Sequence, residues 1–489
     1  MNARFLAALG VCLLCLVVLS GHASQKPSGV PFDFNQTMRV DYFHTGGAAE
    51  AVRDTAGAPI AERLSLDRVV NDGAWPGSRT QLVDPTNLGR YFFEVQTASG
   101  TVIYSRGFAS VYGEWETTSE PARQSRTFHE SLRFPWPTQP VTVVLKKRQA
   151  DGRFLPIWST AIDPSSRFVN RAPIPKPAGK VWPLIENGPP STKVDLLIIS
   201  EGYTQSEMPK FHADARRLLD ALFAEEPFKS RRKDFNVRAL DLASPESGVS
   251  RPNAGVHRRT PLSAEYNIFD SERYVLTLDN RALRDAASAA PYEFVEILVN
   301  DKTYGGGGIF NDQATASVDS AFSTYVFVHE FAHHFAALAD EYYTSDVAYR
   351  TGAKEQPEPW EPNVTALHDP THVKWADLMT PGVPIPTPWD KDAFEAHTRD
   401  SQARRREIRA RNAPESEMDA LFREQMAWDT KFLAGMRYSQ SVGAFEGAAY
   451  EARGLYRPEV DCIMFTRDPV GFCRVCRRAI ERIIDLYSR

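Results

Sequence analysis

The chain has 489 residues, enough for two or three domains and a sizeable core. Hydrophobic residues make up 42% of it and charged residues 24%, which is ordinary for globular proteins and excludes a largely disordered chain. The net charge of −5 offers no global positive field, so neither nucleic acid nor an anionic membrane is expected as a partner.

The first residues predict export. Arg4 precedes an almost unbroken apolar run over residues 5–19, and the small residues Gly21 and Ala23 stand where a signal peptidase reads. We therefore expect a signal peptide over residues 1–23, cleaved after Ala23. The run of roughly 15 apolar residues is shorter than the about 20 of a membrane span. The mature chain is expected outside the cytoplasm, periplasmic or secreted, with no membrane partner.

The cysteines leave their pairing open. Cys12 and Cys15 are removed with the signal peptide, so Cys462, Cys473 and Cys476 remain, an odd number in an oxidising compartment. One bridge involving Cys462 would leave one thiol over. A zinc knuckle is the alternative, but it needs a fourth ligand and no histidine lies nearby in the sequence.

The N-terminal part of the mature chain has the pattern of β structure. Over residues 24–171, short apolar or alternating runs such as 90–95 and 141–145 are separated by Gly, Pro, Asn and Asp. A β-sandwich-like domain is the expected arrangement. Residues 172–190 are rich in proline and are expected to form a linker.

The pattern changes at residue 191, from where a second domain is expected to run to residue 489. Apolar strands alternate with helical periodicity, which indicates an α/β domain with a largely central sheet. The charged stretch 391–427 is expected to form solvated helices, and its basic triplet 404–406 a helix face rather than a nucleic-acid site. The expected strands are 194–200, 235–242 and 294–299, and the expected helices are 206–223 and approximately 281–289.

His329, Glu330 and His333 form the pattern H-E-x-x-H. Residues four apart lie on one face of a helix, about 6 Å apart along the axis, so two imidazoles can hold one zinc ion. Glu330 lies about 100° further round, where a general base belongs. The pattern alone also fits satisfied core histidines.

The flanks of this motif favour a metal site. Phe327, Phe331, Phe335 and Leu338 recur at helical spacing and predict a buried helix. Two histidines and a glutamate on such a helix are costly unless they are paired or bind a metal. His334 points elsewhere and is expected to pack or to support the site rather than to be a ligand.

A third protein ligand is expected after the helix. Asp340 is the preferred candidate, although a continued helix would carry it roughly 16 Å beyond His329. The chain must therefore leave the helix at residues 336–339 and fold back, and a left-handed non-glycine residue there costs about 1–2 kcal/mol. The alternatives are Glu341, Glu358 and Glu361.

Two weaker signals accompany the motif. Gly305 to Gly308 have no side chains, so the backbone there can come close to another chain segment. That segment could be an extended substrate, or a neighbouring element if these residues form a structural loop. Tyr450 and Tyr456 could donate hydrogen bonds to an oxyanion, although packing explains each of them as well.

The run from His329 to Tyr342 resembles the signature of the bacterial IgA peptidase family, which is metallopeptidase family sixty-four. Further motifs resembling its N-terminal and catalytic domains cover essentially the whole mature chain, at residues 38–46, 104–108, 114–115, 244–249, 304–308, 360–365, 454–458, 462–464 and 472–476. Glycines that are usual in the signature are replaced here by Ala332, Ala336 and Ala337, which bears on the geometry of the third ligand. The usual Asp-Gly-Tyr-Thr begins here with Glu201.

The resemblance implies a zinc endopeptidase with a metzincin-like catalytic domain, containing a mixed sheet and an active-site helix, behind a β-rich N-terminal domain. By position, it implies that His329, His333 and Asp340 hold zinc and that Glu330 is the base. Met464 resembles the residue of the turn beneath the metal. Cleavage of immunoglobulin A belongs to particular members, and nothing in these residues specifies it.

These observations predict a secreted zinc-dependent endopeptidase acting on a protein or peptide, with one catalytic Zn²⁺ and Glu330 as general base. One alternative is a zinc hydrolase of a non-protein amide. Another is a non-catalytic exported binding protein that recognises its partner through the β-sandwich and in which the metal site has only a structural role. The free Glu330 argues against the latter, because structural sites usually close with four ligands.

Overall fold

The computed structural model describes residues 31–48, 62–175, 179–343 and 356–488. The expected signal peptide, residues 1–23, lies outside the described residues. Phe32–Arg489 forms one compact unit. None of the helices in the described ranges combines the length and apolar character that crossing a membrane requires.

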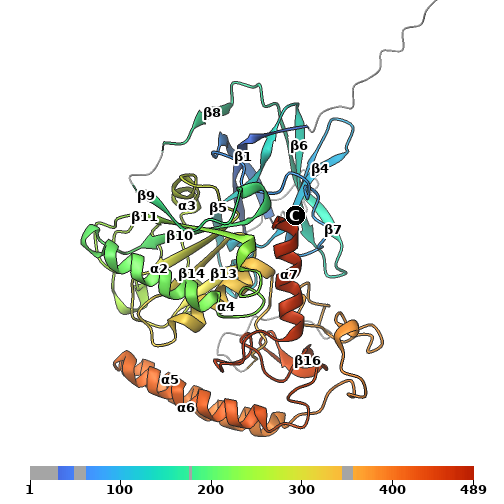
Figure 1. The fold of residues 1–489 in the computed structure, drawn as a ribbon, viewed down its shortest axis with the longest axis vertical. Helices are drawn as coiled ribbons and strands as arrows, with labels where there is room; N and C mark the ends of the chain where they lie inside the picture. Colours follow the sequence, from blue (N-terminus) through green and yellow to red (C-terminus); the bar gives the residue numbers. More distant parts are fainter. Residues whose placement is uncertain (1–30, 49–61, 176–178, 344–355, 489) are drawn as a thin grey trace, which may run out of the picture. The chain divides into compact units, whose positions relative to one another are not determined.

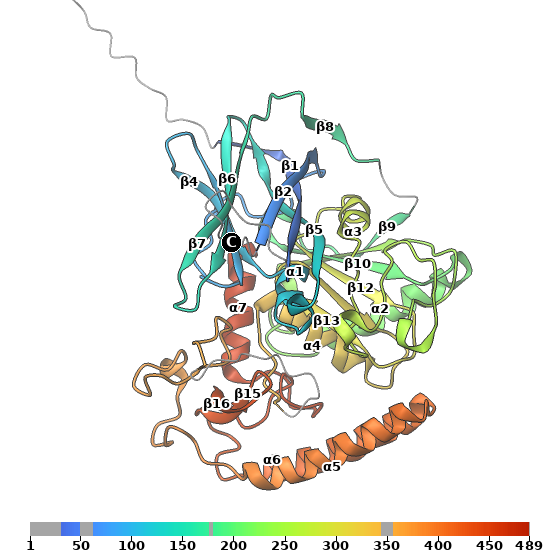
Figure 2. The ribbon, with the colours of Figure 1, turned by 180° about the vertical axis from the view of Figure 1, so that it is seen from behind.

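The first part of this unit contains two four-stranded sheets that share one hydrophobic core (Figure 2). Val40 from one sheet and Phe93 and Val143 from the other lie in the same buried cluster, as expected of a β-sandwich. The runs predicted at 90–95 and 141–145 are β3 and β6, which pair with each other. In order across each sheet, the strands are β5 (Ser125–Pro137), β1 (Phe32–Gly47), β2 (Glu62–Asn71) and β8 (Val169–Pro173), then β4 (Val102–Phe108), β3 (Tyr91–Gln96), β6 (Val141–Arg148) and β7 (Phe154–Ile162).

The second part is built around a six-stranded mixed sheet (Figure 1). Its four central strands are parallel, and antiparallel strands lie at both edges. The strands predicted at 194–200, 235–242 and 294–299 are confirmed as β10, β11 and β12. In order across the sheet, the strands are β13 (Gly306–Ile309), β14 (Gln313–Ser317), β12 (Phe294–Val299), β10 (Val194–Glu201), β11 (Phe235–Asp241) and β9 (Lys180–Ile185).

Strand β9 lies within residues 172–190, which were predicted to form a linker because they are rich in proline. Lys180–Ile185 pairs with β11 at the edge of the sheet, so the range 172–190 contains a strand as well as a connection. Pro183 is tolerated there because an edge strand does not need every backbone N–H for pairing. The proline content concealed the short alternating run that forms the strand.

Helices cover both faces of the six-stranded sheet. Leu196 and Ile198 of β10 pack with α2 and α4, while Leu197 and Ile199 pack with α3 on the other face, so β10 is buried along its whole length. The predicted helices at 206–223 and 281–289 are confirmed as α2 and α3. The helices are α1 (Val111–Glu116), α2 (Met208–Leu222), α3 (Asn280–Ala287), α4 (Ser323–Ala336), α5 (Lys391–Ala410), α6 (Glu415–Ala434) and α7 (Arg474–Ser488), and a small hairpin is formed by β15 (Phe445–Ala448) and β16 (Glu451–Arg457).

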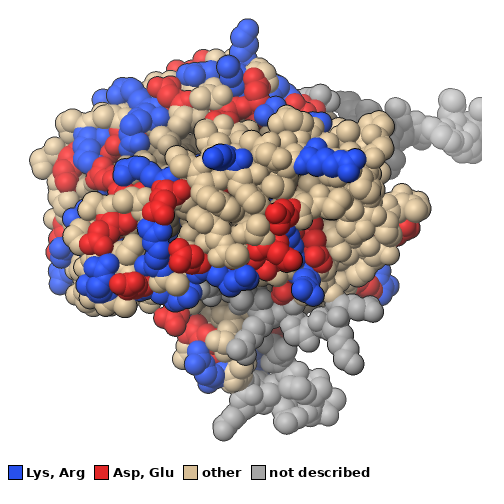
Figure 3. Space-filling view, turned by 90° about the horizontal axis from the view of Figure 1, so that it is seen from below, with Lys and Arg blue, Asp and Glu red and all other residues tan. Residues whose placement is uncertain are grey.

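The charged stretch forms helices as predicted, α5 and α6, and the two lie side by side (Figure 1). Arg404 of the basic triplet donates two hydrogen bonds of 2.7 Å to Glu424 of the neighbouring helix. Figure 3 shows the molecule from below, the side on which these helices lie in Figure 1, and acidic side chains lie among the basic ones there. Arg404 is therefore part of a charge-paired helix surface, while the guanidinium of Arg405 lies over the ring of Phe422.

His44 of β1 lies buried between two carboxylates. Its Nε2 is 2.8 Å from Glu62 and its Nδ1 is 3.0 Å from Glu130. Burial by itself lowers the pKa of His44, but Glu130 and Glu62 raise that pKa to about 9. An unfolded histidine titrates near about 6.5. The interaction of protonated His44 with the two carboxylates therefore stabilises the fold fully below that pH, and this contribution is lost as the pH rises through 9.

We therefore expect His44→Gln to lower the urea-unfolding midpoint strongly at pH 6 and much less at pH 10, when each variant is compared with wild type at the same pH. The exposed His372, 82% exposed at its side chain, provides the control, because His372→Gln should change neither midpoint. An equal loss at both pH values would show that packing, not charge, explains the effect of His44.

Candidate metal centre

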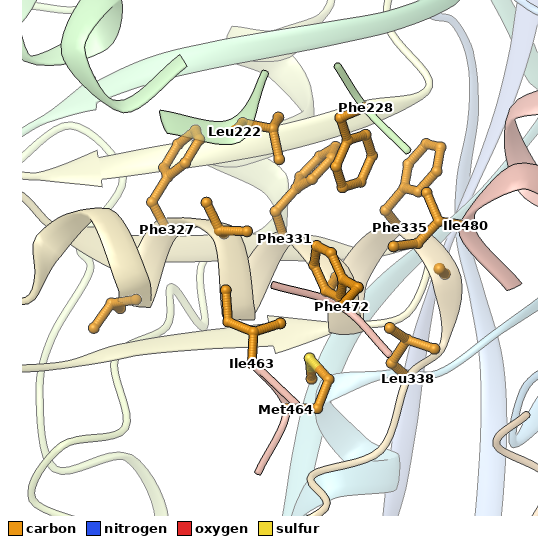
Figure 4. Packing of buried hydrophobic residues seen from close by; sticks show 14 of the residues in the cluster. Leu222, Phe228, Phe327, Phe331, Phe335, Leu338, Ile463, Met464, Phe472 and Ile480 are labelled. Carbon is orange, nitrogen blue, oxygen red and sulfur yellow. The ribbon is translucent and has the colours of Figure 1, made fainter. Parts of the chain in front are cut away.

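The apolar side of α4 fixes the helix in the core. Phe327, Phe331 and Phe335 lie along one side of it, against Leu222 and Phe228 (Figure 4). His329 and His333 each follow one of these phenylalanines by two positions, which corresponds to about 200° round a helix. The packing therefore directs the side chains of His329 and His333 away from the phenylalanine cluster.

The helix ends as the sequence predicted. Ala337 adopts the left-handed conformation, with φ 57° and ψ 29°, and its N–H donates to the carbonyl of His333 at 3.1 Å. Its methyl group is buried against the first domain, which offsets part of the cost of a left-handed alanine. The reversal brings Asp340 back to the histidines, so the missing glycine does not prevent the turn.

Three donor atoms converge beside α4. Nε2 of His329 lies 2.9 Å from Oδ1 of Asp340 and 3.1 Å from Nε2 of His333, and the third side of the triangle measures 3.2 Å. The side chains of these three residues are 4%, 14% and 10% exposed, respectively. Separations of this size match neighbouring ligands about 2.0–2.1 Å from one tetrahedral zinc ion.

The contacts of the Nδ1 atoms of the two rings also favour a metal site. Nδ1 of His329 lies 3.0 Å from the carbonyl of Ile463, and Nδ1 of His333 contacts the carbonyl of Leu338. Carbonyl oxygens can only accept, so each Nδ1 carries the proton. In the neutral rings both Nε2 lone pairs then point at each other and at a carboxylate oxygen, an arrangement that a divalent cation stabilises.

The other candidate ligands lie elsewhere. Glu341 is buried and directed to the cysteines, with its Oε1 3.3 Å from Sγ of Cys476. Glu358 forms an ion pair with Lys374 at 3.0 Å, and Glu361 lines the neighbouring cavity without joining the three donors. His334 accepts from the N–H of Val295 at 3.1 Å and its Nδ1 faces Ile309, so it packs as predicted.

Glu330 lines a cavity of about 340 Å³ together with His333 and Asp340. Burial raises the pKa of Glu330 above its ordinary value, although His329 and His333 oppose the rise. A carboxylate whose pKa is moved towards neutrality is better matched to accepting and returning a proton. The carboxylate of Glu330 therefore lies at the wall of the cavity.

Two family models match the chain. The model described as IgA Peptidase M64 matches residues 182–484, more than half of the chain, and the model described as Peptidase M64 N-terminus matches residues 31–159. The chain belongs to the IgA peptidase M64 family. It is therefore a peptidase of a metallopeptidase family. No curated protein matched the chain in a separate comparison.

Glycines of strand β13 in this M64 peptidase make room for α4. A Cβ atom on Gly308 would lie 2.2 Å from the carbonyl oxygen of Glu330, and one on Gly306 would lie 2.6 Å from Val326. The backbone of Gly306 already bonds to Arg273 and Val275. The glycines thus allow close packing, and at Gly306 the strand is paired within the peptidase rather than open to a substrate.

Tyrosine hydroxyls surround Asp340. Tyr450 lines the cavity and donates to Oδ2 of Asp340. Its hydroxyl is 3.1 Å from that of Tyr342, to which Arg273 donates at 2.6 Å. Tyr456 instead pairs through its backbone in β16, and it is not among the described residues that line the cavity. Tyr450, not Tyr456, is therefore the tyrosine beside the three donors.

The first domain of the M64 peptidase also contributes to the cavity, which the sequence did not reveal. Glu114 of α1 lines it, and the hydroxyl of Tyr274 donates to this carboxylate at 3.4 Å. Burial raises the pKa of Glu114 to about 7, while His333 acts to lower it. More than 200 residues separate Glu114 from the motif, and no local pattern could connect them.

Proposed function

We propose that this M64 peptidase is an exported zinc-dependent endopeptidase in which His329, His333 and Asp340 hold one zinc ion and Glu330 is the general base. The observation that carries the proposal is the triangle of two Nε2 atoms and one carboxylate oxygen, with sides of 2.9–3.2 Å, beside an open cavity. A site with three protein donors and an accessible side is typical of catalytic zinc.

A zinc ion in this position would lower the pKa of its bound water molecule to about 7 and polarise the scissile carbonyl. Glu330 accepts the proton of the attacking water and returns it to the leaving amine. The carbonyls of Ile463 and Leu338 fix the tautomers and orientations of the two histidines. Tyr450 holds the second oxygen of Asp340 and so keeps the first directed at the histidines.

We further propose a metzincin-like arrangement of the catalytic domain over residues 191–489, with Met464 in the turn beneath the site. Met464 is fully buried, and its carbonyl accepts from the N–H of Glu341 at 2.8 Å. The domain over residues 24–171 precedes it, joined through residues 172–190. The apolar run at the N-terminus supports a signal peptide over residues 1–23 and an extracytoplasmic location.

A digest of an unbiased peptide library tests the proposal. The purified protein should cleave internal peptide bonds, lose this activity after treatment with a chelator and regain it with added zinc. Mass spectrometry of the products separates an endopeptidase from a hydrolase of other amides. Cleavage that continues unchanged in the fully metal-free protein would contradict the proposal.

A further inference from the structure

A second set of metal-binding side chains lies next to the proposed catalytic site, in the sequence and in space. Cys462, Cys473, Cys476 and Glu341 are all buried, and none is more than 5% exposed. One donor atom of each lies within 4.8 Å of the others. We call these four residues the thiol cluster.

The three thiols of the cluster are not joined by a disulfide. The sulfurs of Cys462 and Cys476 are 3.9 Å apart, far beyond the about 2.05 Å of a bond between them. The expected bridge involving Cys462 is therefore not present in the structure. The cysteines instead converge on a common centre, as ligands of one ion do.

The backbone around the cysteines directs hydrogen-bond donors at their sulfurs. Cys473 immediately precedes α7 and Cys476 lies in the first turn of that helix, where the helix dipole stabilises negative charge. The N–H of Cys473 donates to the sulfur of Cys462 at 3.3 Å, and the N–H of Cys476 donates to the sulfur of Cys473 at 3.4 Å. Two of the three sulfurs thus already act as hydrogen-bond acceptors.

Glu341 supplies the fourth donor that the sequence lacked. Its Oε1 lies 3.3 Å from the sulfur of Cys476 and accepts from the side-chain amide of Asn363 at 3.0 Å. Its Oε2 has no hydrogen-bond partner among the described residues, although it is fully buried. A buried carboxylate oxygen without a partner is costly unless a cation lies beside it.

We propose that the thiol cluster binds a second divalent metal ion, which is zinc. Three thiolates and one carboxylate are the four ligands of a closed tetrahedral site, and soft sulfur donors select zinc over magnesium or calcium. Burial of all four donors leaves no position for a substrate, so the ion is structural.

The second ion would also position the first, and this consequence rests on the proposed catalytic site. Glu341 follows Asp340 directly, and its N–H donates to the carbonyl of Met464 at 2.8 Å. Cys462 precedes Met464 by two residues. An ion in the thiol cluster therefore ties the segment carrying Asp340 and the Met464 turn to the start of α7.

The metal content of the mature protein, without the proposed signal peptide, tests the proposal. Elemental analysis should find two zinc ions per chain in the wild type. The double variant Cys473→Ser, Cys476→Ser should keep at most the ion at the histidines, and His329→Ala, His333→Ala should keep the ion of the cluster. If only the catalytic proposal fails, the wild type will hold one ion, which the serine variant loses.

Val475→Ala is the matched control, because Val475 is fully buried between the two cysteines and its truncation disturbs packing without removing a ligand. It should retain both ions. A second measurement needs no variant: an organomercurial that reacts with thiols should release one zinc ion from the wild type. A disulfide between two of these cysteines in peptide maps, or thiols that react without releasing metal, would overturn the proposal.

Discussion

Glu330→Gln is expected to leave the metal content unchanged while kcat falls by about 100-fold or more. The amide has nearly the same size and can still form hydrogen bonds, but it cannot accept the proton of the attacking water. Glu330 lies beside the three converging donors rather than among them, so the substitution removes no proposed ligand. The measurement is steady-state cleavage of a peptide found in the library digest, together with elemental analysis.

Glu358→Gln provides the matched control. Glu358 was one of the alternative third ligands in the sequence analysis. In the structure it contacts Lys374 and Thr365 and does not join the three donors beside α4. This variant should cleave the peptide at nearly the wild-type rate. A Glu330→Gln enzyme with normal kcat would exclude Glu330 as the base, and loss of zinc from it would indicate that Glu330 is a ligand instead.

Much of the fold was predictable because it depends on local periodicity. The nearly continuous apolar run at 194–200 predicted a strand buried on both faces, and it is β10 at the centre of the sheet. The phenylalanines spaced by four residues predicted the buried face of α4, and the histidines followed from the same helical geometry. The turn after the helix was predicted because Asp340 cannot reach His329 without it.

The remaining features depend on contacts that no local pattern encodes. Asp340 and Glu341 are chemically similar neighbours, yet the chain directs one to the histidines and the other to the cysteines. The fourth donor of the thiol cluster lies more than 100 residues from the cysteines, so a search for a nearby histidine could not find it. Glu114 reaches the cavity only because the two domains pack together.

The contact between the domains includes a buried cluster of charges around Arg39 of β1. Its guanidinium donates to Asp41 at 2.9 Å and to Asp72 at 2.6 Å, and it also contacts Asp285 of α3 in the catalytic domain. Arg39, Asp41 and Asp72 have fully buried side chains. The arginine therefore neutralises carboxylates that have no access to bulk water.

Arg39→Met is expected to lower the free energy of unfolding by about 3–5 kcal/mol, because it keeps the apolar stem but leaves two buried carboxylates with less compensation. Arg68 and Arg133 still pair with Asp41 and Asp72, which favours the lower part of that range. Urea unfolding followed by tryptophan fluorescence measures the change. Arg153→Met, at an exposed pair with Asp151, should leave the unfolding midpoint nearly unchanged.

A triple variant distinguishes the two physical origins of this loss. If the reduced compensation of the two carboxylates causes it, adding Asp41→Asn and Asp72→Asn to Arg39→Met should recover part of the stability, since neutral amides are less costly to bury than incompletely compensated charges. If instead the arginine acts mainly through its hydrogen bonds and packing, the triple variant will be no more stable than Arg39→Met. The first outcome is expected, because the carboxylates remain buried in the folded domain whether or not the arginine is present.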